Sequence, residues 1–134
     1  MLIPGVTAFL GFQLVAVFNT AFSQKLTRDE QMVHVGAMFL TLVALLLLLT
    51  PAAYHRQAES GWVSQGFVNL SSRLITGATP LFALGMTLDF YLLVRAVSEN
   101  AALALVTALV ILALTVVLWY GVPHVEALAN FLRR

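Results

Sequence analysis

The residues that could do chemistry in this sequence are few, and three of them fall at matching positions in apolar stretches. Asn19 lies near the end of the first stretch, His34 near the start of the second and Asp89 near the end of the third. Because successive stretches would cross a bilayer in opposite directions, we expect these side chains on the same side of it. A His34–Asp89 contact beside Asn19 could hold a proton or a cation, with Asp89 as carrier. The alternative is a structural cluster that joins three helices near the membrane surface.

A second set of polar residues is expected at the opposite side: Tyr54, His55, Arg56 and Arg73. Arginine side chains at a membrane surface can bind lipid phosphates or a carboxylate of a partner protein. The alternative is a belt of snorkelling side chains that contact only headgroups and water. We therefore treat this set as a candidate contact with lipid headgroups or with a partner.

Several kinds of site are not expected. The chain has no cysteine, which excludes disulfides and thiolate metal sites. His34 and His55 lie about 31 Å apart along one helix and cannot share a metal or a haem. No nucleophile–base pair stands at a convincing spacing, and the net charge of +1 offers no basic run for nucleic acid. We predict no catalytic residue, cofactor or metal, and Gln13, an amide in the first stretch, is expected to hydrogen-bond across helices.

Four apolar stretches must position these residues. Hydrophobic residues make up 60% of the 134-residue chain and charged residues 10%. Each stretch approaches or exceeds the ~20 residues that a helix needs to cross a bilayer. The spans are predicted at about 3–22, 33–53, 74–94 and 101–122. The fold class predicted is therefore all-α, an integral membrane four-helix bundle formed by a single transmembrane domain, 1–134.

The ends and interiors of these helices carry local signals. Thr27 or Asp29 is expected to cap the second helix, and Ser98 or Asn100 the fourth. Pro51 should kink or end the second helix. Pro80 should bend the third, where Thr76 and Thr79 can bond the carbonyl that it frees. Small residues at helical spacing should allow close packing, either within the bundle or against another protein: Ala16 with Thr20, Ala37 with Thr41, Thr79 with Ala83 and Thr87, and Ala104 with Ala108.

The C-terminal residues and the distribution of basic residues suggest how the chain is oriented in a membrane. Residues 124–134 show an amphipathic pattern, which predicts a short helix on the membrane surface. Counting basic residues on each side gives four against three and favours both termini inside. The four are Arg56, Arg73, Arg133 and Arg134, and the three are Lys25, Arg28 and Arg95.

Two blocks of the sequence resemble a known family. They are Pro4-Gly5-Val6 with Gly11-Phe12-Gln13, Phe18 and Phe22, and then Pro51-Ala52-Ala53-Tyr54-His55-Arg56. This PG…GFQ…PAAYHR pattern resembles a bacterial family of small four-helix integral membrane proteins of unknown function. The resemblance extends over Leu2 to Arg73 and implies the bacterial inner (cytoplasmic) membrane, with several passes. It implies no activity.

Two functions follow as expectations. The first is a small non-catalytic membrane protein, an accessory or structural subunit, that packs against membrane lipids and other membrane proteins in a complex or homo-oligomer. The alternative is a small ion- or proton-coupled transporter that uses Asp89 and His34. An enzyme and a nucleic-acid-binding protein are not expected.

Overall fold

The chain folds into helices throughout the part that is described. The structure is a computed structural model that describes residues 2–58 and 63–123. Its elements are α1 (Leu2–Val17), α2 (Thr20–Lys25), α3 (Arg28–Ala58), α4 (Gln65–Ser98), α5 (Ala101–Val116) and a π-helical turn, η1 (Val117–Gly121). These ranges contain no strand, so the all-α prediction is confirmed. The surface helix predicted over 124–134 lies outside the described residues.

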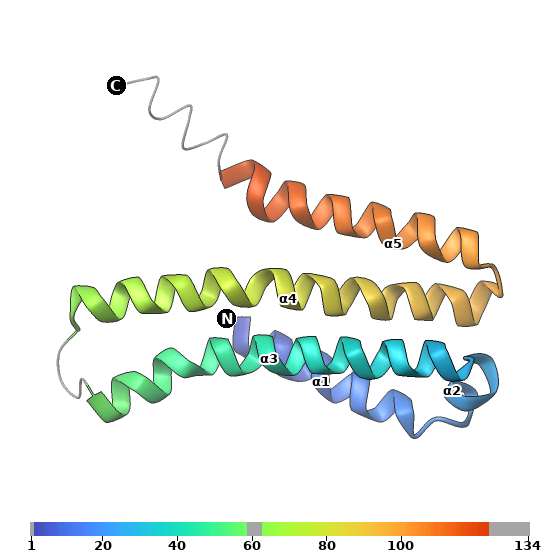
Figure 1. Cartoon of the computed structure of the whole chain (residues 1–134), viewed down its shortest axis with the longest axis horizontal. Coiled ribbons are helices and arrows are strands. Elements are labelled where there is room, and N and C mark those ends of the chain that lie inside the picture. Colours follow the sequence, from blue (N-terminus) through green and yellow to red (C-terminus); the bar gives the residue numbers. More distant parts are fainter. Residues whose placement is uncertain (1, 59–62, 124–134) are drawn as a thin grey trace.

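The long helices α3 and α4 form an antiparallel hairpin at the centre of the molecule (Figure 1). The helix α5 packs along α4 on the side away from α3, and α1 packs against α3. The short α2 turns the chain from α1 into α3, at the end of the hairpin where α4 passes into α5. The α3–α4 contact is the most extensive one, so this hairpin is the frame that positions the other helices.

Small side chains allow α3 and α4 to approach closely. The buried residues of α3 recur every three or four positions and so lie on one face: His34, Ala37, Thr41, Ala44, Leu48 and Pro51. Gly85 of α4 faces this row. A Cβ added to Gly85 would lie 2.8 Å from the Thr41 Oγ1 and 2.9 Å from the Ala37 carbonyl oxygen. Only glycine fits at this crossing.

The helix α5 uses the same kind of contact on the other face of α4. Its buried residues, Ala104, Ala108 and Thr115, lie on one side of the helix at helical spacing. Near its end, Trp119 stacks on Phe82 of α4 with ring centroids 6.5 Å apart, and the Tyr120 hydroxyl lies 3.2 Å from the Thr79 Oγ1. The remaining face of α5 exposes large apolar side chains, among them Leu103, Val106, Leu109 and Val110.

The first predicted span differs from the structure. The sequence predicts one helix over 3–22, but α1 ends at Val17 and α2 begins at Thr20, with Asn19 as its N-cap. The extended backbone of Asn19 (φ −80°, ψ 131°) breaks the helix, and its side chain accepts a hydrogen bond from the Ala21 N–H. An amide side chain competes for the backbone in this way and favours a new N-terminus over an unbroken helix. With 16 residues, α1 extends only about 24 Å.

Neither proline ends the helix that contains it. The helix α3 continues through Pro51 to Ala58, so Pro51 does not end it. Pro80 lies inside α4, where it removes the backbone donor for the Thr76 carbonyl. The Thr79 hydroxyl donates to that carbonyl at 2.9 Å, as the sequence predicted. The freed acceptor is thereby satisfied, and α4 stays continuous from Gln65 to Ser98.

Three of the helical segments are long and apolar enough to cross a membrane, judged by length and composition: Arg28–Ala58, Gln65–Ser98 and Ala101–Gly121. The first apolar helix, Ile3–Val17, is shorter. It falls below the ~20 residues that a full crossing requires.

Candidate functional site

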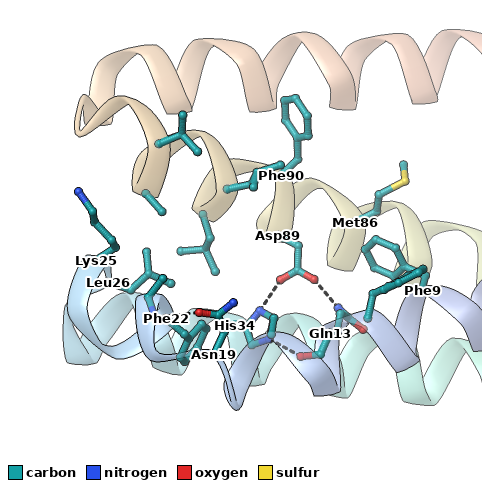
Figure 2. A pocket seen from close by; sticks show the side chains of 17 residues that line it. Phe9, Gln13, Asn19, Phe22, Lys25, Leu26, His34, Met86, Asp89 and Phe90 are labelled. Carbon is teal, nitrogen blue, oxygen red and sulfur yellow. Dashed lines mark hydrogen bonds and ion pairs between the residues drawn. The ribbon is translucent and has the colours of Figure 1, made fainter.

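A buried hydrogen-bond network joins three helices (Figure 2). The His34 Nδ1 lies 2.8 Å from the Asp89 Oδ1, and the Gln13 Nε2 donates to the Asp89 Oδ2 at 2.6 Å. The His34 Nε2 lies 3.0 Å from the backbone carbonyl oxygen of Gln13. Gln13 and His34 are 3% and 5% exposed, which removes this network from solvent at its centre.

Each member of this network comes from a different helix: Gln13 from α1, His34 from the second turn of α3 and Asp89 from α4. His34 belongs to the buried face of α3, three residues before Ala37. Asp89 follows Gly85 by one helical turn. The close approach at Gly85 therefore brings the carboxylate within reach of the imidazole. The Phe22 ring covers the imidazole edge-on at a centroid distance of 5.0 Å.

The structure brings together two of the three residues predicted for this cluster. His34 and Asp89 share a hydrogen bond, whereas the Asn19 side chain caps α2 through the Ala21 N–H. Asn19 is exposed and lies on the wall of the same cavity as the pair (Figure 2). The third member of the network is Gln13, whose side chain bonds across helices as predicted, to Asp89.

The hydrogen-bond pattern fixes where protons must be. A backbone carbonyl oxygen only accepts, so the His34 Nε2 carries a hydrogen and donates to the Gln13 carbonyl. The Nδ1–Oδ1 contact with Asp89 then needs one further proton, on the imidazole or on the carboxyl. Without that proton, the nitrogen lone pair would face a carboxylate oxygen at 2.8 Å in a largely buried site. The pair therefore holds one exchangeable proton.

One polar atom of the network has no partner among the described residues. The Gln13 Oε1 is buried and accepts no hydrogen bond within residues 2–58 and 63–123. A buried acceptor without a donor costs about 1–3 kcal/mol. This amide oxygen is therefore a ready acceptor for a donor that enters from outside the chain.

A cavity of about 500 Å³ opens beside the network, between α1, α2 and α4. Gln13, His34 and Asp89 contribute its polar wall, and Asn19 and Lys25 line it as well. The rest of the lining is mainly apolar, with four phenylalanines: Phe9, Phe12, Phe22 and Phe90. Cavities of this size, apolar with a few polar groups, are typical of small-molecule sites.

Two ion pairs tie the helix ends near this cavity. Arg95 of α4 lies 3.1 Å from the Glu30 carboxylate of α3. Lys25 of α2 pairs with Glu99, which follows α4, and this hydrogen bond holds the pKa of the Glu99 carboxyl below its usual value. Lys25 lines the cavity, but its ammonium group pairs with Glu99. The charge of Lys25 is therefore balanced by Glu99 and not by Asp89.

The second predicted set lies at the other end of the hairpin. Tyr54 stacks on Phe67 of α4 with centroids 6.2 Å apart, and the His55 ring lies 5.2 Å from the same phenylalanine. Arg56 and Arg73 are exposed. The structure thus brings Tyr54 and His55 together around Phe67, which the sequence analysis had not included, and leaves both arginines at the surface.

The helices and the buried network define a small all-helical protein with three long apolar helices and a polar cluster beside a cavity. The chain matches the Family of unknown function (DUF6328) over residues 1–123, and it belongs to that family. No curated protein and no solved structure matches the chain.

Proposed function

We propose that this chain is an integral membrane protein that exchanges a proton at the His34–Asp89 pair, as a small proton-coupled transporter does. The observation that carries the proposal is the single proton that this buried pair requires next to an open cavity. A buried ionisable pair in an apolar helix bundle is costly, and in membrane proteins such pairs mark ion and proton pathways.

Membrane insertion is part of this proposal. It is supported by three helical segments of sufficient length and by the apolar side chains that α5 exposes. In water, so much exposed apolar surface would promote aggregation, whereas lipid tails would cover it without cost. The resemblance of the PAAYHR block supports a bacterial inner membrane.

The orientation is proposed from the charges at the two ends of the hairpin. Arg56 and Arg73 lie exposed at one end, where we also expect Arg133 and Arg134, and Lys25, Arg28 and Arg95 lie at the other end, which gives four basic residues against three. We place the Arg56 end in the cytoplasm, because basic residues near helix ends favour that side. The chain has no cysteine, so Arg56→Cys can be labelled in intact cells with a membrane-impermeant maleimide. Labelling without lysis would overturn this orientation.

The transport proposal is tested in liposomes with an entrapped pH indicator, after an acid step outside and with potassium and valinomycin to hold the potential at zero. We expect wild-type protein to admit protons and Asp89→Asn to reduce the rate at least tenfold. Asp29→Asn is the matched control, because Asp29 is exposed at the start of α3. Equal rates for wild type and Asp89→Asn, or no rate above that of empty liposomes, would refute the proposal.

A second candidate function is an accessory subunit that packs against other membrane proteins. The observation that favours it is the position of α5, which packs on α4 and leaves a long apolar face. Purification in a mild detergent tests this candidate by size-exclusion chromatography with light scattering. A larger complex or a homo-oligomer is expected, and a monomer under every condition would count against it.

A further inference from the structure

We propose that the cavity binds a small lipophilic primary ammonium ion, held by the Asp89 carboxylate and the Gln13 side-chain oxygen, in exchange for the proton of the His34–Asp89 pair. The inference names the substrate class of the proposed transporter, and the exchange step rests on that function. The binding site itself follows from the acceptors, the rings and the charges around the cavity.

The deep polar wall of the cavity offers acceptors. The Gln13 Nε2 is used by Asp89, while the Gln13 Oε1 is buried and unpaired within the described residues. The His34 Nε2 hydrogen is used by the Gln13 carbonyl. Once the shared proton leaves, the His34 Nδ1 and the Asp89 Oδ1 also become acceptors. A ligand that satisfies this wall must therefore donate hydrogen bonds.

A primary ammonium group has as many N–H donors as there are side chains that offer an acceptor. It carries three N–H donors, and the wall supplies acceptors on Gln13, His34 and Asp89. The His34 Nδ1 and the Asp89 Oδ1 are 2.8 Å apart, so these two side chains would have to separate to admit the ammonium nitrogen in place of the shared proton. The amide oxygen of Gln13 shares its carbon with the nitrogen that lies 2.6 Å from the carboxylate.

The apolar part of the cavity fits the rest of such a ligand. Phenylalanine rings line it from both sides, with Phe9, Phe12 and Phe22 on α1 and α2 and Phe90 on α4. Ring faces attract cations as well as apolar groups. A volume of about 500 Å³ accommodates a one- or two-ring aromatic amine with room for its approach.

The charges around the cavity favour exchange of the shared proton for the ammonium ion over binding of the ammonium ion to the protonated pair. Asp89 is the acidic side chain on the cavity wall, and the other charge there, Lys25, is balanced by Glu99. Glu30 of α3 is held by Arg95 of α4. The protonated pair is neutral overall, so an ammonium ion added to it would leave one uncompensated positive charge in a site of low dielectric. Loss of one proton to solvent for each ammonium bound leaves the net charge of the site unchanged.

The test compares four ligands with one ring system, by titration calorimetry on the full chain in lipid nanodiscs at pH 7, with empty nanodiscs as blank. The ligands are 1-naphthylmethylamine, its N,N,N-trimethyl derivative, 1-naphthylmethanol and 1-naphthoate. We expect saturable binding of the primary amine and at least tenfold weaker binding of the other three. Equal binding of the trimethyl cation would overturn the role of the donors. Equal binding of the alcohol would show that the charge of the ligand is not recognised, and would overturn the proposed ammonium site.

Variants of the chain test the same site. Gln13→Met and Asp89→Asn should each weaken binding of the amine at least tenfold. Gln65→Met, at the opposite end of α4, and Asp29→Asn, exposed in the first turn of α3, should not. Far-UV circular dichroism and the elution volume report whether each variant folds. Should Asp89→Asn not fold, the comparison of ligands on the wild-type chain still decides the question. Unchanged binding in a folded Gln13→Met would contradict the assignment of the amide oxygen.

Proton release is measured by repeating the titration in two buffers of different ionisation enthalpy. One proton released per amine bound is expected, and release of none would overturn the exchange. This experiment separates the two proposals. Amine binding without proton influx into liposomes loaded with 1-naphthylmethylamine would refute the transporter and leave the site standing. Proton flux that depends on Asp89, without amine binding, would refute the substrate class alone.

Discussion

The contact at Gly85 makes the α3–α4 crossing sensitive to a single methyl group. A Cβ at this position would lie 2.8 Å from the Thr41 Oγ1 and 2.9 Å from the Ala37 carbonyl oxygen, and the second of these atoms belongs to the backbone. The Thr41 hydroxyl already donates to the same carbonyl at 3.0 Å. Neither neighbour can move aside without separating the helices. Gly85→Ala is therefore expected to destabilise the hairpin.

The magnitude follows from a comparison with Gly77→Ala in the same helix. A Cβ at Gly77 meets no other atom within 4 Å. Both substitutions gain the same helix propensity, about 0.5–1 kcal/mol, so this contribution cancels between them. What remains at Gly85 is the overpacking cost of about 1–3 kcal/mol. The unfolding constants of the two variants should then differ by about 5- to 150-fold.

Equilibrium unfolding in mixed micelles of a mild detergent and sodium dodecyl sulfate measures this difference, with helix content followed by far-UV circular dichroism. Gly77→Ala is expected to be at least as stable as wild type, and Gly85→Ala clearly less stable. If both variants unfold at the same fraction of dodecyl sulfate, the helices are not as close at Gly85 as the structure indicates, and the reasoning fails.

Three other substitutions test local interactions. Asn100→Ala removes the acceptor for the Ala102 and Leu103 N–H groups at the start of α5 and should cost about 1 kcal/mol in the same unfolding assay, with Asn100→Asp retaining stability. Thr79→Val leaves the carbonyl freed by Pro80 without a donor and should cost about 1–3 kcal/mol, more than Thr76→Val. Because Lys25 lowers the pKa of Glu99, the ion pair stabilises the fold above the unfolded carboxyl pKa and loses this effect as the pH falls through the folded value. Wild type should therefore exceed Glu99→Gln in stability near pH 7 at low salt, and the two should converge in acid; a gap that persists in acid would contradict this assignment.

Local signals in the sequence predicted much of the helical structure. Of the two candidates for each cap, Thr27 caps α3 and Asn100 caps α5, and Glu30 adds a reciprocal bond to the Thr27 N–H. The small residues Ala37, Thr41, Ala104 and Ala108 are all buried at helix contacts. These features depend on neighbours within one or two turns, which the order of residues determines directly.

One contact between distant residues, the His34–Asp89 hydrogen bond, was predicted from the depth of the two residues in the apolar stretches. Competition for backbone groups and the exact packing of α1 were not predicted. The break at Asn19 reflects an amide that bonds the backbone, and hydropathy alone does not detect it. Gln13 joins the network because α1 lies along α3, and its Asp89 partner is far away in sequence. Spacing offered one signal: Gln13 precedes Asn19, and Asp89 precedes Arg95, by the same six residues, which is about 9 Å in the unbroken helices predicted from the sequence.

The Gln13–Asp89 hydrogen bond can form only late in the synthesis of the chain. Its two residues are 76 positions apart in the sequence, and a ribosome adds roughly 5–20 residues per second. Gln13 is therefore synthesised about 4–15 s before Asp89, its hydrogen-bond partner. His34, the other partner of Asp89, is synthesised roughly 3–11 s before it. During that interval α1 and α3 must persist with unmatched polar groups. Chaperones or insertion factors that shield these groups would act on the nascent chain before α4 is complete.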